Sequence, residues 1–329
     1  MRKIFDNSED YLEYLKGKYQ KKYKNEKVVD DEFHRITIQQ MEKIGQRLPI
    51  GSENGLESVI SNSFKTIVQS LPATRRALVD GHIAAGVLEH GQANAFIARS
   101  PNGKLAILFS SGLAMFLHKY IKLVCASVDP RQIVYCNRKD YKEITRDDTG
   151  QYIGEMIEHF KIYSIPRGPF VKLSEKETLR ASGILNFAET FILCHELGHF
   201  FNGDLDGGSH FTALPAGISG EKFDENKDHE MEYRADSVGY GIYLETINKI
   251  SPGISPQAAL SPVMLMFDLF YQLAGGESST HPHPHDRVVR IVHNYFSPEM
   301  AVRAAEGLRD PRLLPDVFPT PDSETEGAI

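Results

Sequence analysis

The segment Leu193–Phe200 constrains the fold of this chain most, because it reads Leu-Cys-His-Glu-Leu-Gly-His-Phe. His195 and His199 are four residues apart, so on an α-helix they project from one face and can reach a single metal ion. Glu196 then lies beside that ion, where a carboxylate can accept a proton from an attacking water. H-E-x-x-H within a helix therefore indicates the site of a metal-dependent hydrolase, with Glu196 as the general base.

The residues before the motif predict a long helix that faces the protein core. One side of it repeats at three- and four-residue steps through Leu185, Ala188, Ile192, His195 and His199. Ser174 opens a capping box and Asn202-Gly203 supplies a stop, so we expect a helix or a broken pair of helices over 175–202, with the break at Gly183. The alternative is a buried helix that holds two histidines by chance, because the motif is short.

A candidate third ligand, Glu232, begins the segment Glu232-Tyr233-Arg234-Ala235-Asp236. Its two carboxylates again stand at helical i, i+4 spacing. Glu232 would complete a His, His, Glu set, which suits Zn²⁺ and leaves one position for water. Asp236 would then accept a hydrogen bond from the outer ring nitrogen of a ligating histidine. The competing interpretation is a charged, solvent-exposed helix face.

A histidine-rich segment follows, His281-Pro282-His283-Pro284-His285-Asp286-Arg287. Three histidines within five residues are typical of a metal-binding tract. The alternative is a proline-stiffened loop that leads into a helix beginning near Asp286. The residues alone leave both interpretations open.

Together the three segments resemble the gluzincin zinc metallopeptidases of the family that includes the heat-shock membrane peptidases and the CAAX-prenyl proteases. In that family H-E-x-x-H is followed by E-x-x-A-D and then by H-P-x-x-x-x-R, which correspond here to 195–199, 232–236 and 281–287. The resemblance implies a zincin-like core and one Zn²⁺ ion per chain. It also implies that His281 stabilises the oxyanion of the reaction and that Arg287 orients the site.

A fourth, weaker match lies upstream, where Asn94-Ala95-Phe96 and Ser111-Gly112-Leu113 resemble the family's N-A-F strand and G-L helix start. Residues 93–99 and 104–110 alternate around a Pro-Asn-Gly turn, which predicts a β-hairpin. In the family the N-A-F strand is the edge with which an extended peptide pairs. We therefore expect Asn94, Ala95 and Phe96 to bind the substrate backbone.

Two features depart from the family pattern. About sixty residues, roughly 125–180, separate the G-L helix from H-E-x-x-H, whereas relatives run almost directly between them, so we expect an inserted substructure with possible strands in 131–173. Most of those relatives are also integral membrane proteins, but the most apolar stretch here, Leu105–Leu117, has 13 residues, short of the ~20 that span a bilayer. The phage-exclusion metallopeptidases are a second resemblance, based on H-E-L-G-H and on solubility.

Bulk composition favours a cytoplasmic globular protein. The chain has 329 residues, of which 41% are hydrophobic and 25% charged, and no secretory signal is visible at its start. Cys125, Cys136 and Cys194 are too few for a disulfide framework, which favours a reducing compartment. Cys194 adjoins the first ligand, but one residue rotates it about 100° away along a helix, so we exclude it as a ligand.

The predicted organisation has a helical, polar N-terminal arm, a peptidase domain and a tail. These occupy 1–50, 56–310 (with the insertion at about 125–180) and 311–329, with a loop at 50–55 between the first two. Within the domain we expect helices over 56–90, 113–127, 228–250, 257–274 and 286–307, and a mobile glycine-containing loop over 203–227. The tail carries prolines and acidic residues and is expected to be flexible.

The arm carries a basic cluster at Lys16, Lys18, Lys21, Lys22, Lys24 and Lys27. Such a cluster can contact nucleic acid or lipid headgroups. In that case the arm would be a sensor of nucleic acid or membrane that controls the peptidase. A solvated helix face is the more common role and is the interpretation we favour. A net charge of −7 also argues against nonspecific nucleic-acid binding by the whole surface.

The sequence thus predicts an α+β, mostly helical protein with a zincin-like core, a small antiparallel edge sheet and an active-site helix. The expected function is that of a soluble, cytoplasmic zinc endopeptidase that cleaves a protein or peptide substrate through a zinc-activated water. His195, His199 and Glu232 would hold the metal, Glu196 would act as base and His281 as oxyanion donor. The rival is a zinc-stabilised regulatory or binding protein with a vestigial catalytic site. Structural zinc sites usually have four ligands rich in cysteine, which favours the enzyme.

Overall fold

The computed structural model describes residues 3–22, 52–89, 91, 93–136, 144–163, 166, 168–169, 171–205, 225–274, 281–300 and 302–303. The helices are α1 (Ser8–Lys22), α3 (Ser52–Ser70), α4 (Ala73–Val79), α5 (Ser111–Val128), η1 (Pro130–Gln132, 3₁₀), α6 (Arg146–Tyr163), α7 (Glu175–Asn202), α8 (Glu225–Ile250), α9 (Pro256–Ala274) and α10 (Pro284–Tyr295). The strands are β1 (Ile83–Leu88), β2 (Ala95–Arg99), β3 (Leu105–Ser110), β4 (Ile133–Cys136) and β5 (Val171–Leu173). The expected mostly helical α+β class is confirmed.

α7, which carries the H-E-x-x-H motif, is one unbroken helix of 28 residues. The Ser174 side chain accepts a hydrogen bond from the backbone N–H of Glu177, and Gly203 ends the helix in the left-handed conformation at φ 74°. The predicted break at Gly183 is wrong. A glycine inside a helix costs about 1 kcal/mol relative to alanine, and the continuous burial of residues 188–199 outweighs that cost.

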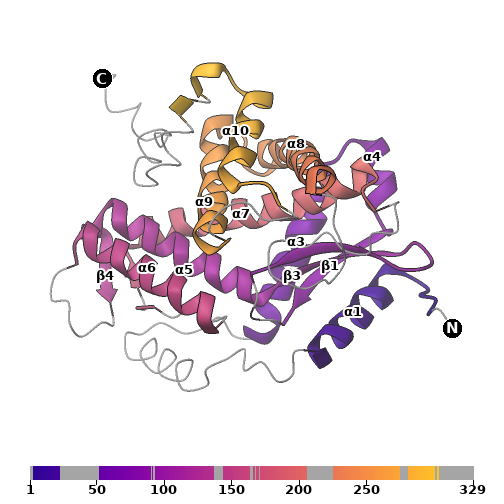
Figure 1. Ribbon diagram of the computed structural model, residues 1–329, viewed down its shortest axis with the longest axis horizontal. Helices are drawn as coiled ribbons and strands as arrows, with labels where there is room; N and C mark the ends of the chain where they lie inside the picture. Colours follow the sequence, from indigo (N-terminus) through magenta and orange to yellow (C-terminus); the bar gives the residue numbers. More distant parts are fainter. Residues whose placement is uncertain are drawn as a thin grey trace.

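α7 passes through the middle of the molecule, with α8, α9 and α10 on one side and the three-stranded sheet on the other (Figure 1). Two glycines allow α8 to approach the motif closely. A Cβ atom at Gly198 of α7 would overlap the backbone carbonyl of Ala235, and one at Gly239 of α8 would lie 2.8 Å from the Cα of His195. The glycine of H-E-L-G-H therefore sets the distance between the two helices.

The sheet beside α7 has the strand order β1-β3-β2, with β2 antiparallel and β1 parallel to the central β3. The predicted hairpin over 93–110 is confirmed. The prediction of helix throughout 56–90 is wrong at Ile83–Leu88, because this short apolar run lacks a period that would separate a buried strand from a buried helix. The sheet is consequently mixed rather than purely antiparallel, and β2 occupies one edge.

α1 covers the face of the sheet that points away from α7. Tyr11, Leu12 and Leu15 of α1 are buried together with the alternate strand residues Ala84, Leu88, Phe96, Ala98, Ala106 and Leu108. Lys16, one of the basic cluster, pairs with Glu13 and with Glu57 of α3, each at 2.9 Å. α3 begins at Ser52, inside the loop expected over 50–55, and residues 23–51, with Lys24 and Lys27, lie outside the described residues.

The region between α5 and α7 forms its own small substructure, as expected for 125–180. β4 and β5 pair antiparallel, which confirms extra strands in 131–173, and α6 lies between them in sequence. α6 packs on α5, where the rings of Phe116 and Phe160 stack with centroids 4.5 Å apart. The insertion therefore extends the core along α5 (Figure 1).

The C-terminal helices α8, α9 and α10 match the expected segments 228–250, 257–274 and 286–307, except that α10 begins at Pro284 and ends at Tyr295. An aromatic cluster joins α8 and α9 to α7, since the ring of Phe191 contacts those of Tyr240, Tyr243 and Phe267. Within the described ranges, no helix has the length and apolar character needed to cross a bilayer. The loop expected over 203–227 lies outside the described residues from 206 to 224, as does the tail.

The close crossing of α7 and α8 predicts opposite effects of alanine at two glycines of one helix. Gly198→Ala should lower the free energy of unfolding by about 1–3 kcal/mol, because the new methyl group meets backbone that cannot move away. Gly183→Ala meets nothing within 4 Å and should raise stability by about 0.5–1 kcal/mol through helix propensity. Urea unfolding of both variants measures these changes. Equal changes in the free energy of unfolding would contradict the close approach of α7 and α8 at Gly198.

Glu189 of α7 predicts a pH dependence of stability. Its side chain is buried, and burial raises its pKa from 4.5 to about 7. The native state therefore keeps a proton that the unfolded chain loses, so the free energy of unfolding falls as the pH rises from the unfolded to the folded pKa. Glu189→Gln removes this loss and should stabilise the protein by about 1–3 kcal/mol more near pH 8 than near pH 5. Parallel unfolding curves of both proteins at the two pH values test it; a constant difference would contradict it.

Candidate metal centre

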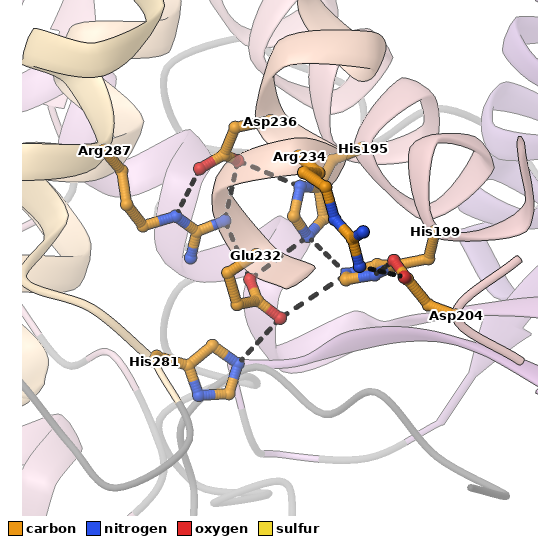
Figure 2. A network of polar contacts seen from close by, with 8 residues as sticks. All are labelled: His195, His199, Asp204, Glu232, Arg234, Asp236, His281 and Arg287. Atoms are coloured by element: carbon orange, nitrogen blue, oxygen red, sulfur yellow. Dashed lines mark hydrogen bonds and ion pairs between the residues drawn. The ribbon is translucent and has the colours of Figure 1, made fainter. Parts of the chain in front are cut away.

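Three predicted ligands converge where α7 and α8 cross. Nε2 of His195 lies 3.2 Å from Nε2 of His199. The two carboxylate oxygens of Glu232 face these nitrogens, Oε2 at 3.5 Å from His195 and Oε1 at 3.4 Å from His199 (Figure 2). One possible ligand atom from each residue lies within 4.8 Å of the others, and all three side chains are buried. This His, His, Glu group can bind a metal ion.

Asp236 and Arg287 stand behind His195. Oδ1 of Asp236 lies 2.9 Å from Nδ1 of His195. Arg287 of α10 donates two hydrogen bonds to the same carboxylate, at 2.6 and 2.7 Å, and its Nη2 lies 3.0 Å from Oε2 of Glu232. Burial alone would raise the pKa of Asp236, but the Arg287 charge outweighs it and lowers that pKa. Asp236 therefore stays ionised beside the histidine.

His281 reaches the site from the segment before α10. Its Nε2 lies 3.7 Å from Oε1 of Glu232, and burial lowers its pKa to about 4. His283 instead caps α10, where its Nδ1 accepts the backbone N–H of His285 at 3.2 Å. The ring of His285 lies 4.5 Å from that of Tyr271. Of these three described histidines, only His281 faces the candidate ligands, so they do not form a joint metal-binding tract.

The predicted base Glu196 meets the open edge of β2. It is 1% exposed, and burial raises its pKa, opposed by a backbone hydrogen bond from Ile97. Asn94 accepts the backbone N–H of Ser110 and so turns its backbone towards β3. Because backbone direction alternates along a strand, Ala95 and Ile97 present their N–H and C=O groups at the other edge, towards α7. In the described part of the chain, Oε2 of Glu196 is buried with no hydrogen-bond partner.

This alternation separates the three residues expected to bind substrate. The side chains of Ala95 and Phe96 are buried, and the Phe96 ring contacts Tyr19 of α1. Of the three, Ala95 turns its backbone to the open edge, whereas Asn94 and Phe96 turn theirs to β3. Ile97 is the next residue of β2 whose backbone faces away from β3.

Asp204 and Arg234, which lie behind His199, were not predicted from the sequence. Nδ1 of His199 lies 2.9 Å from Oδ2 of Asp204, and Nη2 of Arg234 lies 3.1 Å from Oδ1 of that carboxylate (Figure 2). Asp204 directly follows the glycine that ends α7, and Arg234 is a variable position of E-x-x-A-D. The only signal in the sequence is an acidic residue just after the helix stop.

The charge of the site favours a cation. Four carboxylates surround the two histidines and are accompanied by two guanidinium groups: Glu196, Asp204, Glu232 and Asp236 against Arg234 and Arg287. Buried groups of unequal charge are costly unless a counter-ion compensates them. Imidazole nitrogens with one carboxylate also match the donors that Zn²⁺ and similar divalent metals take. The residues present therefore fit a divalent metal ion.

Comparisons with known proteins give no relative for this chain. No protein-family model matches it, and no match was found among curated proteins or solved structures.

The ligand geometry predicts metal-dependent stability. Zn²⁺ added to metal-free protein should bind at about one ion per chain and raise the free energy of unfolding, by about 2.7 kcal/mol at a hundredfold excess over Kd. His199→Ala should lose most of this gain in stability. Glu230 is an exposed carboxylate that pairs with Arg290, so Glu230→Gln should keep the gain. Metal analysis after dialysis and thermal unfolding measure both effects. A gain of equal size in His199→Ala would place the metal elsewhere.

Proposed function

We propose that this chain is a soluble, cytoplasmic zinc-dependent endopeptidase with a zincin-like core, which hydrolyses peptide bonds of a protein substrate. One observation carries the proposal: the carboxylate of Glu196 lies beside the His, His, Glu group and accepts a hydrogen bond from the backbone of Ile97 in β2. That arrangement places a candidate metal site, a base and a strand edge that could pair with a peptide next to one another. The ordered motifs of the gluzincin resemblance support it.

Zinc is the metal that the donor set favours for this role. Three protein ligands of the His, His, Glu type are typical of catalytic zinc sites, whereas structural sites usually have four ligands and often cysteine. Cys194 is fully buried and lies outside the ligand group. When bound, Zn²⁺ would supply Lewis acidity and a water of lowered pKa.

The side chains of the chain supply the remaining chemistry. Glu196 takes the proton of the attacking water and returns it to the leaving amine, because a carboxylate can act as base and then as acid. Asp236 and Arg287 hold His195 in a fixed orientation. His281, on the far side of Glu232 in Figure 2, donates an N–H to the oxygen that becomes negative in the tetrahedral intermediate.

An extended peptide would pair with the edge of β2 that does not face β3. Ala95 and Ile97 offer backbone donors and acceptors there, so affinity comes from main-chain hydrogen bonds and not from a particular substrate sequence. The site is closed in this structure, since His281, at 6%, is the most exposed of the candidate ligands and catalytic groups. A substrate must therefore displace the contact between Ile97 and Glu196 as it pairs with the strand.

The same burial favours a second candidate, a regulatory or binding protein in which zinc stabilises the fold and Glu196 is vestigial. Chelation separates the two functions. Loss of zinc should unfold a protein whose metal is structural, but should remove only hydrolysis from an enzyme whose core forms without it.

Glu196→Gln tests the peptidase directly. An amide cannot accept the proton, so the variant should retain zinc and fold while losing hydrolysis by at least roughly 100-fold. Proteome-wide comparison of new protein N-termini in cells that express the wild-type chain or the variant would detect this. Glu230→Gln, outside the site, serves as the matched control and should produce the wild-type termini.

Termini confined to the wild type and the control would support proteolysis and identify the substrate. Full turnover of a peptide by Glu196→Gln would remove this residue from the mechanism. Identical termini in all three strains, together with unfolding on chelation, would favour the zinc-stabilised binding protein.

A further inference from the structure

Asp204 binds His199 through both its side chain and its backbone. Oδ2 of Asp204 lies 2.9 Å from Nδ1 of His199. The backbone N–H of Asp204 donates to the carbonyl of the same histidine at 3.1 Å. Gly203 makes this return possible, because its left-handed φ of 74° reverses the chain at the end of α7. The carboxylate is thereby fixed against the ring nitrogen that points away from Glu232.

Arg234 completes this arrangement from α8. Its Nη2 lies 3.1 Å from Oδ1 of Asp204, the oxygen that does not face the histidine. Arg234 is two residues after Glu232, so α8 supplies both a metal ligand and the cation that holds the partner of another ligand. The pair ties the last turn of α7 to α8 at a second point.

Each candidate histidine ligand has a carboxylate beside its Nδ1, but only the contact between His199 and Asp204 has hydrogen-bond geometry. Nδ1 of His195 faces Asp236, which Arg287 holds, and Nδ1 of His199 faces Asp204, which Arg234 holds (Figure 2). The two sets differ in exposure, because the Arg287 side chain is 4% exposed and that of Arg234 is 51% exposed. Solvent and salt screen the second set more strongly.

We propose that Asp204 is a positioning residue for the metal centre, which fixes the ring orientation and the tautomer of His199, and that Arg234 holds Asp204 in place. A neutral imidazole carries one N–H, so a carboxylate that accepts it at Nδ1 leaves the Nε2 lone pair for the metal. This role rests on the proposed metal-dependent function. It adds to the family motifs a residue that lies outside all of them.

Zinc affinity and the NMR shift of the His199 Nδ1 proton test the proposal without an activity assay. In Asp204→Asn the amide can donate to Nδ1 and favour a proton on Nε2, so Zn²⁺ should bind roughly 10- to 100-fold more weakly. Arg234→Gln should weaken binding by roughly 2- to 5-fold, and less at high salt, because the Arg234 side chain is half exposed. Competition with a chromophoric chelator measures the affinities.

Arg290→Gln is the matched control. Arg290 is 47% exposed and pairs with Glu230 at 3.0 Å, close to the 51% exposure and 3.1 Å distance of Arg234, but Glu230 is itself 55% exposed and lies outside the site. Its Zn²⁺ affinity should equal that of the wild type. In the zinc-loaded proteins the His199 Nδ1 proton should resonate further downfield in the wild type, where a carboxylate accepts it, than in Asp204→Asn, and a merely structural role for Asp204 would not move this ¹H NMR signal.

The outcomes distinguish this proposal from the proposed function. Wild-type protein that binds no Zn²⁺ would overturn both. If the wild type binds Zn²⁺ but Asp204→Asn binds it with equal affinity and shows an unchanged NMR shift of the His199 Nδ1 proton, the positioning role alone is overturned. If Asp204→Asn does not fold, the decision falls to Arg234→Gln against Arg290→Gln: a loss of affinity confined to Arg234→Gln supports the role, and equal affinities refute it.

Discussion

The close approach of α7 and α8 is the constraint on which the site depends. Gly198 and Gly239 leave no side-chain atoms where the helices cross, so the backbones come within contact distance. That contact brings Glu232 and Asp236 of α8 to the two ring nitrogens of His195, Nε2 and Nδ1. Distance between the ligands is thus set by backbone packing, which is stiff, and not by long side chains that would lose conformational entropy on ordering.

Packing and charge are arranged around this contact in layers. One turn before His195 on α7, Phe191 belongs to the aromatic cluster that packs α7 against α8 and α9. Around it, each candidate histidine ligand meets a carboxylate, and each carboxylate meets an arginine. Buried charges of this kind are retained in proteins when they are paired and hydrogen-bonded, and a residual negative charge leaves a place for a cation.

Local spacing predicted the parts of the site that one helix turn can encode. The pairs His195 with His199 and Glu232 with Asp236 follow from i, i+4 geometry, and the structure brings them together. Asp204 was missed because its position depends on how the chain reverses after Gly203, and Gly198 because its role depends on a helix distant in sequence. β1 was missed because its apolar run carries no period. Tertiary contacts, not local propensity, decide such positions.

The end of α7 has an electrostatic consequence of its own. His199 lies in the last turn of a 28-residue helix that stops at Gly203. Aligned peptide dipoles give the C-terminal end of a helix a partial negative charge, equivalent to about half an elementary charge within the final turn. The helix that presents the histidines therefore also directs a negative field at the place they surround, so the backbone itself contributes to the attraction of a cation.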